Sequence, residues 1–435
     1  MRKENEPEHE FSPGVLVDSL ATRALSSPSL STRRLRVVVH DYLGHPHQLE
    51  LSRELARRGH YVLHLYCNSC SVPRGRAVRL PDDPLDLTVR GMPGPRPGAH
   101  SWRRRTAELG YARRVAAAIK EFRGEIVVSG NAPPQVQLEL RRRTRRKSRF
   151  VSWVQDMVNV PITAQVGATP FLGSSRGLQL RIDRALERCA LALSRDVITI
   201  APNFVRRLRD IGIPQDRIEL IPNWGPTELL HAQPRPWPPI QDLADQKIIL
   251  YAGTLDGRHG SHLLAALAEA CHRSSKGVVV VTSEGTAADE LKARSSHRLR
   301  VCGFQPYEQV PDMLAAADLL IVSVSPEAAE MSVPSKVLSY LCAGRAVFAA
   351  VPSDSPVADL IRDSGAGVVT PPEDPRRCAE TALALLDDPD RLAAMGRAGR
   401  LYAEKHFDLD RITRRFEQVF LSAVNSKYEK GKTSA

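Results

Sequence analysis

The chain of 435 residues has few aromatic side chains, no long apolar run and only seven scattered cysteines. Aromatic residues make up 5%, too few for the stacking platforms that bind single-stranded nucleic acid. No run reaches the roughly 18 uncharged apolar residues that a membrane-spanning helix needs. The amino terminus leads directly into Glu4, Glu6, Glu8 and Glu10, without the apolar centre of a signal peptide. These absences predict a cytoplasmic protein without a transmembrane segment.

The odd number of cysteines favours reduced thiols over a disulfide framework. Cys67-Asn-Ser-Cys70 is the single C-x-x-C motif, and a zinc site would need a second pair of ligands at suitable spacing. We therefore predict no metal. The net charge of +12 and the isoelectric point near 9.6 predict anionic partners, whether nucleotide phosphates, nucleic acid or an anionic membrane.

The first half of the chain follows a strand–helix–strand pattern. Residues 1–33 are polar and rich in serine and proline, which predicts a disordered tail with room for a short helix over 15–25. Strands over 35–40 and 61–66 enclose a helix over 46–58, as in a βαβ unit. Residues 71–100 hold many prolines and glycines and predict a long loop, followed by a basic helix over 103–122. Further strands are predicted over 125–129, 149–154, 196–200 and 218–221.

The second half repeats this architecture after a proline-rich stretch, 225–245, which predicts a linker. Its length and pattern favour a second α/β domain rather than one larger core. Residues 376–420 are predicted to be helical throughout. Strands are predicted over 247–252, 277–282, 298–301, 318–324, 346–350 and 367–370.

The stretch 327–347 combines a polar loop, a helix start, a glycine stop and a strand. Pro334 suits the first turn of a helix, and Gly344 suits its end. A helix that begins at the carboxyl end of a parallel strand presents N–H groups and a positive dipole end, to which Lys336 adds a full charge. The pattern predicts a diphosphate site, or else an ordinary strand–helix junction with a solvated lysine.

Several short motifs occur together and in order. They are Arg53–His60, Val151-Ser-Trp-Val-Gln-Asp156, Ile221-Pro-Asn-Trp224, Tyr251-Ala-Gly-Thr-Leu255, Val301-Cys-Gly-Phe304, Val333-Pro-Ser-Lys-Val-Leu-Ser-Tyr-Leu341 and Gly344-Arg-Ala-Val347. Over residues 35–420 the set resembles the group 1 (GT4-type) retaining glycosyltransferases, and in particular the bacterial enzymes that build exopolysaccharide and O-antigen units.

The resemblance implies an α/β protein of the GT-B fold, with two Rossmann-like domains and a cleft between them. The acceptor-binding domain would span 34–228 and the nucleotide-sugar-binding domain 246–405. A linker over 229–245 would join them, a helix over 406–426 would return to the first domain, and 427–435 would form a flexible tail.

The same resemblance implies a donor site in the second domain. Gly253 and Thr254 would let the backbone approach the phosphates and sugar, while Gly303 and Phe304 would flank the base, unless Phe304 belongs to the core. Arg258 would bind phosphate, unless it is a surface arginine. The helix start adds Ser332, Val333, Pro334, Ser335 and Lys336. Relatives carry two glutamates where this chain has Met331 and Ser339, so Glu327 and Glu330 are predicted to bind the donor hydroxyls instead.

Asp156 and Gln155 end a strand of the first domain. Asp156 is predicted to orient the acceptor or take its proton, or else to serve as a loop or capping residue. His45, His47 and Asn131 are further acceptor candidates. No cofactor is predicted besides the nucleotide sugar. Asp408-Leu-Asp410 matches an acidic metal motif, but its place at a helix start assigns it no metal.

The densest charge run, 140–149, is either a solvated helix end, a nucleic-acid contact or a patch that meets anionic lipid. No nucleic-acid-binding module surrounds it, so we favour peripheral membrane contact at the inner face of the cell membrane. The predicted function is retaining transfer of a sugar, UDP-linked by preference, to a carbohydrate or lipid-linked acceptor. A nucleotide-sugar epimerase of the same fold and a catalytically degenerate partner of another transferase remain alternatives.

Overall fold

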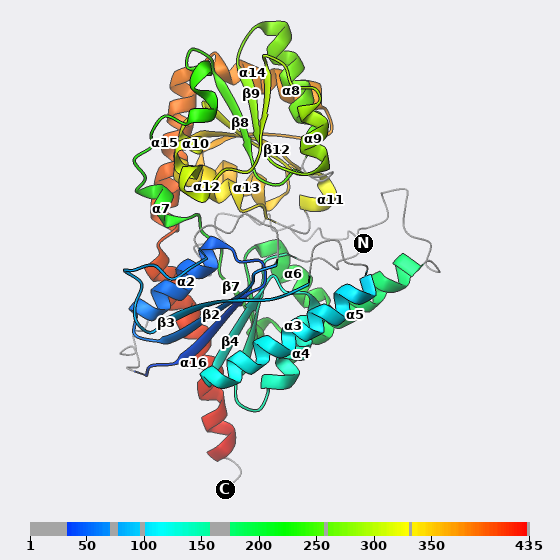
Figure 1. The fold of residues 1–435 in the computed structure, drawn as a ribbon, viewed down its shortest axis with the longest axis vertical. Coiled ribbons are helices and arrows are strands. Elements are labelled where there is room, and N and C mark those ends of the chain that lie inside the picture. Colours follow the sequence, from blue (N-terminus) through cyan, green and yellow to red (C-terminus); the bar gives the residue numbers. More distant parts are fainter. Residues whose placement is uncertain are drawn as a thin grey trace, which may run out of the picture. The chain divides into compact units, whose positions relative to one another are not determined.

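The computed structural model describes residues 33–69, 77–95, 101–156, 175–255, 260–329 and 333–432. Two parallel sheets organise this part of the chain (Figure 1). The first has the order β3-β2-β1-β4-β5-β6-β7 and the second β10-β9-β8-β11-β12-β13. Both contain the Rossmann order, in which strand succession reverses beside the first strand.

The strand bounds follow the runs of β-branched residues. In the first sheet they are β1 (Arg36–Asp41), β2 (Tyr61–Cys67), β3 (Leu87–Met92), β4 (Ile126–Gly130), β5 (Arg149–Val154), β6 (Asp196–Thr199) and β7 (Ile218–Leu220). In the second they are β8 (Ile248–Ala252), β9 (Val278–Thr282), β10 (Leu299–Cys302), β11 (Leu319–Ser323), β12 (Ala346–Ala350) and β13 (Gly367–Thr370). The central strands are buried on both faces, as parallel strands covered by helices must be.

Alternating side chains of each strand face two different helix layers. Val38 of β1 packs in the core beneath α3 (Ser101–Phe122) and α4 (Pro134–Thr144), whereas Val37 and Val39 face the opposite core. That core includes side chains of α2 (Pro46–Arg57), α6 (Pro202–Asp210) and α16 (Leu409–Lys432). Next to α4 lies α5 (Ser175–Leu193) (Figure 1).

The second sheet has the same arrangement. One face is covered by α8 (Ser261–Ser274) and α14 (Pro375–Leu386). The other is covered by α10 (Val310–Ala315), α12 (Lys336–Ala343), α13 (Pro356–Ser364) and α15 (Pro389–His406). The remaining short elements are α7 (Thr227–Leu230), α9 (Thr286–Lys292), α11 (Pro326–Ala329) and the 3-10 helices η1 (Gln215–Arg217), η2 (Pro238–Leu243) and η3 (Tyr307–Gln309).

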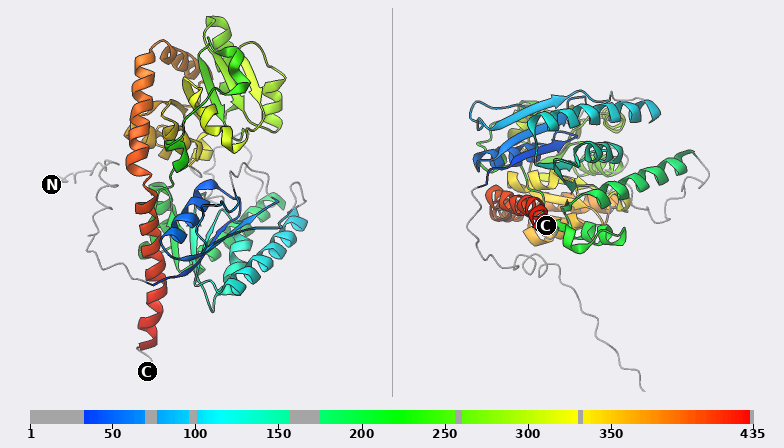
Figure 2. Two further views of the ribbon diagram at one scale, coloured as in Figure 1. Left: turned by 60° about the vertical axis from the view of Figure 1, so that its left-hand side comes forward. Right: turned by 90° about the horizontal axis from the view of Figure 1, so that it is seen from below.

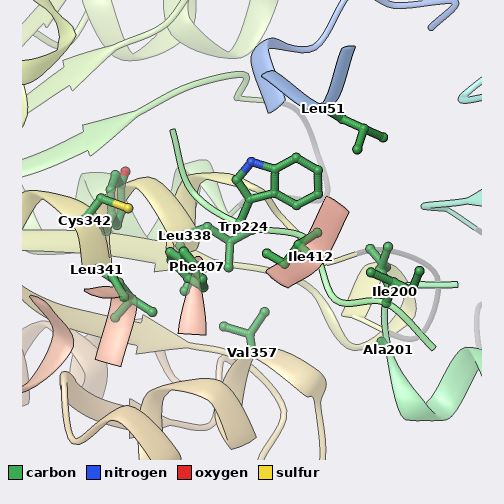
Figure 3. Close-up of a cluster of buried hydrophobic side chains, with 14 of the residues drawn as sticks. Leu51, Ile200, Ala201, Trp224, Leu338, Leu341, Cys342, Val357, Phe407 and Ile412 are labelled. Atoms are coloured by element: carbon green, nitrogen blue, oxygen red, sulfur yellow. The ribbon is translucent and has the colours of Figure 1, made fainter. Parts of the chain in front are cut away.

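One buried cluster contains side chains from elements of both sheets (Figure 3). Trp224 lies within it, 1% exposed, and its indole N–H donates to Glu50 Oε2 at 2.7 Å. The Trp224 ring stacks on that of Trp153 with centroids 6.2 Å apart. Phe407 and Ile412, on either side of the start of α16, belong to the same cluster.

The helix α16 runs beside α2 (Figure 2), and ion pairs connect it to the residues at the end of α2. The Glu417 carboxylate is 5% exposed and accepts hydrogen bonds from Arg58 at 2.8 and 2.9 Å. His60 Nε2 lies 2.9 Å from the same carboxylate. Burial opposes its charge, but these partners outweigh burial and lower the pKa of Glu417.

Three predicted boundaries are wrong. The loop predicted over 71–100 contains β3, whose Thr88 and Arg90 are both exposed at the sheet edge. The helix predicted over 376–420 is interrupted after α14 and after α15, where Asp388 and Asp408 cap the following helices. The helix predicted to open at Pro334 begins at Lys336. At its end α16 continues to Lys432, and the helix suggested over 15–25 lies outside the described residues.

Candidate active site

The donor candidates of the second sheet gather around Lys336, the first residue of α12. Its Nζ donates to Tyr251 Oη at 2.6 Å and lies 3.8 Å from the centroid of that ring. The Tyr251 hydroxyl donates in turn to the carbonyl of Thr254 at 2.7 Å. Tyr251 belongs to β8, so these contacts hold the ammonium group at the carboxyl end of the sheet's first strand.

Gly253 completes this corner, where a side chain would strain the backbone and crowd Lys336. Its φ of +122° is one that side-chain-bearing residues rarely adopt. A Cβ at this position would lie 3.3 Å from Cε and 3.4 Å from Nζ of Lys336. Its N–H donates to the carbonyl of Thr282 on the neighbouring strand at 3.0 Å. The structure thus brings together Gly253, Thr254 and Lys336, three of the predicted donor-site residues.

The Tyr340 hydroxyl fixes α12 against the end of β8. It accepts the N–H of Ala252 at 3.0 Å and is placed to donate to the carbonyl of the same residue at 3.3 Å. Burial raises the pKa of Tyr340, so the phenol stays protonated as this donation requires. Sequence reasoning included Tyr340 in a motif but gave it no role.

Gly303 and Phe304 follow β10 and contact Glu284, which follows β9. The Phe304 N–H donates to Glu284 Oε1 at 3.1 Å, and a Cβ on Gly303 would lie 3.2 Å from that oxygen. Phe304 is half-buried and not part of the buried core. Beside Glu284, the buried Ser283 hydroxyl has no hydrogen-bond partner among the described residues. Sequence reasoning missed both residues, although their position directly after a strand was visible.

The loop before α12 is described in part. Val333 and Pro334 are half-buried, Ser335 is exposed, and the Ser335 side chain does not cap the helix. Arg258, Glu330 and Ser332 lie outside the described residues, as does the side chain of Glu327.

In the first sheet the acceptor candidates surround Asp41, the last residue of β1. This carboxylate is fully buried and accepts the N–H of Leu43 at 3.1 Å and that of His45. Its Oδ1 also lies 3.4 Å from His45 Nδ1. Burial alone would raise the pKa of Asp41, but His45 and the charges of the neighbouring histidines lower it. Burial would likewise lower the pKa of His45, but Asp41 and the charge of Asp156 raise it.

A chain of amides and imidazoles continues from His45. Asn131, which has a φ of +54°, places Nδ2 3.2 Å from His45 Nδ1 and 3.2 Å from Gln155 Oε1. His47 Nε2 lies 3.3 Å from the same Gln155 oxygen. Burial and the charge of His45 lower the pKa of His47 to about 3, so its ring is neutral. The structure therefore brings together His45, His47, Asn131 and Gln155 at the carboxyl ends of β1, β4 and β5.

Asp156 is exposed and acts on His45 through its charge. Sequence reasoning missed Asp41 and Gln48. Both side-chain atoms of the Gln48 amide are buried and have no hydrogen-bond partner among the described residues. Gly130 leaves room for this amide, since a Cβ there would lie 2.9 Å from Gln48 Nε2. The signal that could have revealed Asp41 is its position four residues before His45, at the end of a buried strand.

Among the described residues, no cluster of three or more histidine, cysteine, aspartate or glutamate side chains is placed to hold a metal ion. The acidic pair near the carboxyl terminus has structural contacts instead. Asp408 caps α16 through the N–H of Arg411 at 3.1 Å, and Asp410 pairs with Arg58 and Arg414. In the described part of the chain, no helix has the length and apolar composition needed to cross a bilayer.

Comparisons with known proteins place this geometry in a family. The model of the glycosyl transferase 4-like domain matches residues 44–224, and that of the group 1 glycosyl transferases matches residues 246–388. The Escherichia coli (strain K12) protein named "Putative colanic acid biosynthesis glycosyl transferase WcaI" is 23% identical over 252 residues. That match covers 55% of this chain and 60% of the relative's length.

Solved structures show the same fold. Sucrose-phosphate synthase from Thermosynechococcus elongatus has a TM-score of 0.68 at 16% identity, over 90% of this chain and 100% of that one. The Anabaena protein Alr3699/HepE in complex with UDP-glucose has a TM-score of 0.63 at 15% identity, over 89% of this chain and 100% of that one. With both halves matched by family models and two Rossmann-like sheets, the chain belongs to the group 1 (GT4-type) glycosyltransferases of the GT-B fold.

Proposed function

We propose that this protein is a retaining glycosyltransferase that uses a nucleotide-diphosphate sugar. The acceptor in this proposal is a carbohydrate or a lipid-linked glycan of bacterial polysaccharide or glycoconjugate biosynthesis. Membership of the family and the name of the Escherichia coli relative support it. The observation that carries the proposal is the Lys336 ammonium group, held by Tyr251 beside the side-chain-free backbone of Gly253.

The diphosphate is the part of the donor that needs positive charge, because it becomes more anionic as the sugar leaves. A cation held in place before the reaction stabilises that charge without rearranging. Lys336 fits this role because one hydrogen bond and one ring face orient it. Arg258, Glu330 and Ser332–Ser335 complete the donor side of the proposal, and Glu327 is assigned to the donor hydroxyls.

The proposed transfer takes place on one face of the sugar. The acceptor oxygen bonds to the anomeric carbon while the bond from that carbon to the phosphate oxygen breaks. The acceptor proton passes to the departing phosphate, so neither an enzyme nucleophile nor a metal is part of the scheme. The network of His45, Asn131 and Gln155, with Asp156 nearby, is assigned to positioning the acceptor hydroxyl.

Nucleotide binding tests the donor side directly. UDP is the first nucleotide to use, because the similar Anabaena protein was solved with UDP-glucose. Replacing Lys336 by alanine removes a charge-assisted contact worth about 1.5–3 kcal/mol, which is roughly a 10- to 150-fold weaker Kd. Lys276→Ala is the matched control, since that exposed lysine pairs with Asp387 at 2.7 Å. Equal affinity of Lys336→Ala and wild type, measured by calorimetry, would remove Lys336 from the donor site.

Product analysis tests the reaction class. Incubation with UDP-sugars and a mixed glycan acceptor should yield a glycoside with the donor's anomeric configuration, visible in its proton NMR coupling. Omitting the acceptor should abolish the sugar product. A changed sugar formed without acceptor would assign the chain to the epimerases, and no affinity for UDP, GDP or dTDP would favour the non-catalytic alternative. We place the reaction in the cytoplasm.

A further inference from the structure

A groove between α3, α4 and α5 lies outside the residues assigned to the proposed reaction. Its cavity is about 630 Å³. Its apolar lining comes from one or two leucines of each helix, namely Leu109, Leu138, Leu186 and Leu193. Its rim is basic and contains Arg105, Arg141, Arg142 and Arg145, beside the carboxylate of Glu139. A groove with an apolar lining and a rim of arginines suits a ligand that is both hydrophobic and anionic.

The neighbouring surface of α5 has the same character. Ile182 and Leu193 are 40% and 54% exposed, and few other large apolar side chains in the described part of the chain are as exposed. Ala185, Cys189 and Ala192 are exposed at helical spacing between them. The exposed charges on this face are Arg181 and Arg188, while Asp183 is half-buried and pairs with Arg105. A helix with an exposed apolar stripe and basic flanks is typical of helices that lie on a bilayer.

The end of α4 concentrates positive charge beyond what its acidic neighbour neutralises. Glu139 pairs with Arg142 and Arg143, and these contacts lower the pKa of Glu139 to about 2. Arg145, Arg146 and Lys147 follow and are exposed.

Arg141 lines the groove, and not all of its guanidinium nitrogens have a hydrogen-bond partner among the described residues. Its Nε donates to the carbonyl of Leu193 at 3.0 Å, but Nη1 is buried and has no hydrogen-bond partner among the described residues. Burial lowers the pKa of Arg141, and the charges of Arg149 and Arg145 lower it further. A phosphate group beside these arginines would offset the repulsion between their charges.

We propose that this face docks on an anionic phospholipid bilayer, with the exposed side of α5 in the interface and phosphate headgroups on the arginine rim. We name it the α4–α5 face and define it by Arg141, Arg142, Arg145, Ile182 and Leu193. A single-stranded nucleic acid would use aromatic side chains for stacking, and the apolar side chains exposed here are aliphatic. A bilayer satisfies both the aliphatic and the basic parts of the surface.

The position of the groove gives the contact a use in the proposed reaction. Its lining begins at Gln135, four residues after Asn131, and continues along α4 to Arg145. The eleven residues of α4 span about 16 Å. A lipid-linked acceptor held at the bilayer would therefore lie beside the acceptor candidates. Docking itself needs neither donor nor acceptor, so its test is independent of the transfer reaction.

Vesicle co-sedimentation of the full chain tests the proposal. Wild type should bind phosphatidylcholine vesicles that contain phosphatidylglycerol, should not bind pure phosphatidylcholine, and should release as salt rises. Each arginine near an anionic surface contributes about a fivefold change in partitioning. The triple variant Arg141→Gln, Arg142→Gln, Arg145→Gln should therefore bind roughly 100-fold more weakly. The double variant Ile182→Ser, Leu193→Ser should lose the binding that remains at high salt.

The matched control carries Arg376→Gln, Arg377→Gln and Arg391→Gln, three exposed arginines of α14 and α15. It should bind like wild type, and circular dichroism should show all variants folded. Equal loss in the control and in the α4–α5 triple variant would assign the effect to overall charge and overturn the proposal. Failure of wild type to bind the anionic vesicles would overturn it as well.

Discussion

Three buried histidines beside the acceptor candidates should make the fold sensitive to mild acid. The rings of His40, His47 and His64 are fully or almost fully buried. Burial lowers the pKa of His40 and of His64 to about 4 and that of His47 to about 3, because the cation cannot be solvated there. His40 Nδ1 lies 2.9 Å from the Ser129 hydroxyl, and His40 Nε2 lies 2.9 Å from the Tyr111 hydroxyl.

In the unfolded chain these rings titrate near a pKa of about 6.5. Because the folded pKa is lower, the unfolded state binds more protons once the pH falls below that value. The stabilisation is complete above pH 6.5 and is lost as the pH falls toward 4. At pH 5 the loss is about 2 kcal/mol for each ring, or roughly 6 kcal/mol for the three. Total stabilities are about 5–15 kcal/mol, so this is a large fraction.

His45 acts in the opposite direction. Its pKa is raised in the folded chain, so its stabilisation is present below pH 6.5 and is lost as the pH rises. It offsets part of the loss from the other three rings. Asp41 and Glu417 have lowered pKa values, so their stabilisation is present above the unfolded pKa of a carboxyl group and is lost only at lower pH. The interval from pH 7 to 5 therefore leaves these two contributions nearly unchanged.

Urea unfolding at pH 7 and pH 5 measures the effect. In His64→Gln the amide replaces a ring whose Nδ1 lies 2.8 Å from Ser52 Oγ, and the titrating group is gone. The variant should be less stable than wild type at pH 7, but should lose about 2 kcal/mol less between the two pH values. His272→Gln, at an exposed position of α8, controls for the replacement itself. Identical losses in His64→Gln and wild type would refute the reasoning.

Three further substitutions probe the remaining contacts. Gly253→Ala places a side chain at a φ of +122° and should cost about 1–3 kcal/mol in urea unfolding; UDP affinity should fall with it in calorimetry, and unchanged values would show that the corner adapts. Tyr340→Phe leaves the Ala252 N–H without its partner and should cost about 1–3 kcal/mol by the same unfolding assay, against no change if water replaces the hydroxyl. Glu417→Gln leaves Arg58 without its bidentate partner and should lower the free energy of unfolding by about 2–3 kcal/mol at pH 7. An unaltered value would mean that apolar packing alone holds α16.

The fold was predictable because its central strands are short runs of β-branched residues between helices of clear period. Residues 37–39 and 278–281 are such runs, and both are buried on both faces. The strand β3 was missed because it lies at the sheet edge, where one side needs no apolar side chains, and because prolines and glycines surround it. Edge position removes the very pattern by which a strand is recognised.

The corner formed by Gly253 and Lys336, which we propose as part of the donor site, was predictable in part, since both residues lie in motifs that resemble those of the family. The groups that hold them were not. The hydroxyl of Tyr340 meets the backbone of Ala252 across 88 residues of sequence, and only the pairing of β8 with β11 brings them together. Asp41 was missed because a single aspartate at the end of a strand has many possible uses, and its spacing from His45 gains meaning once its full burial shows it at the centre of a polar network.

The two sheets have the same topology but opposite chemistry at their switch points. At the first, the Asp41 carboxylate already accepts N–H groups just before α2, so the positive end of that helix is neutralised and a phosphate would meet negative charge. At the second, the Ser335 side chain does not cap α12 and Lys336 adds a cation there. A diphosphate therefore suits only the second switch point, and a neutral hydroxyl suits the first. Duplicated Rossmann topology supplies two similar edges, and in our proposal a few charged residues determine which edge would bind the nucleotide.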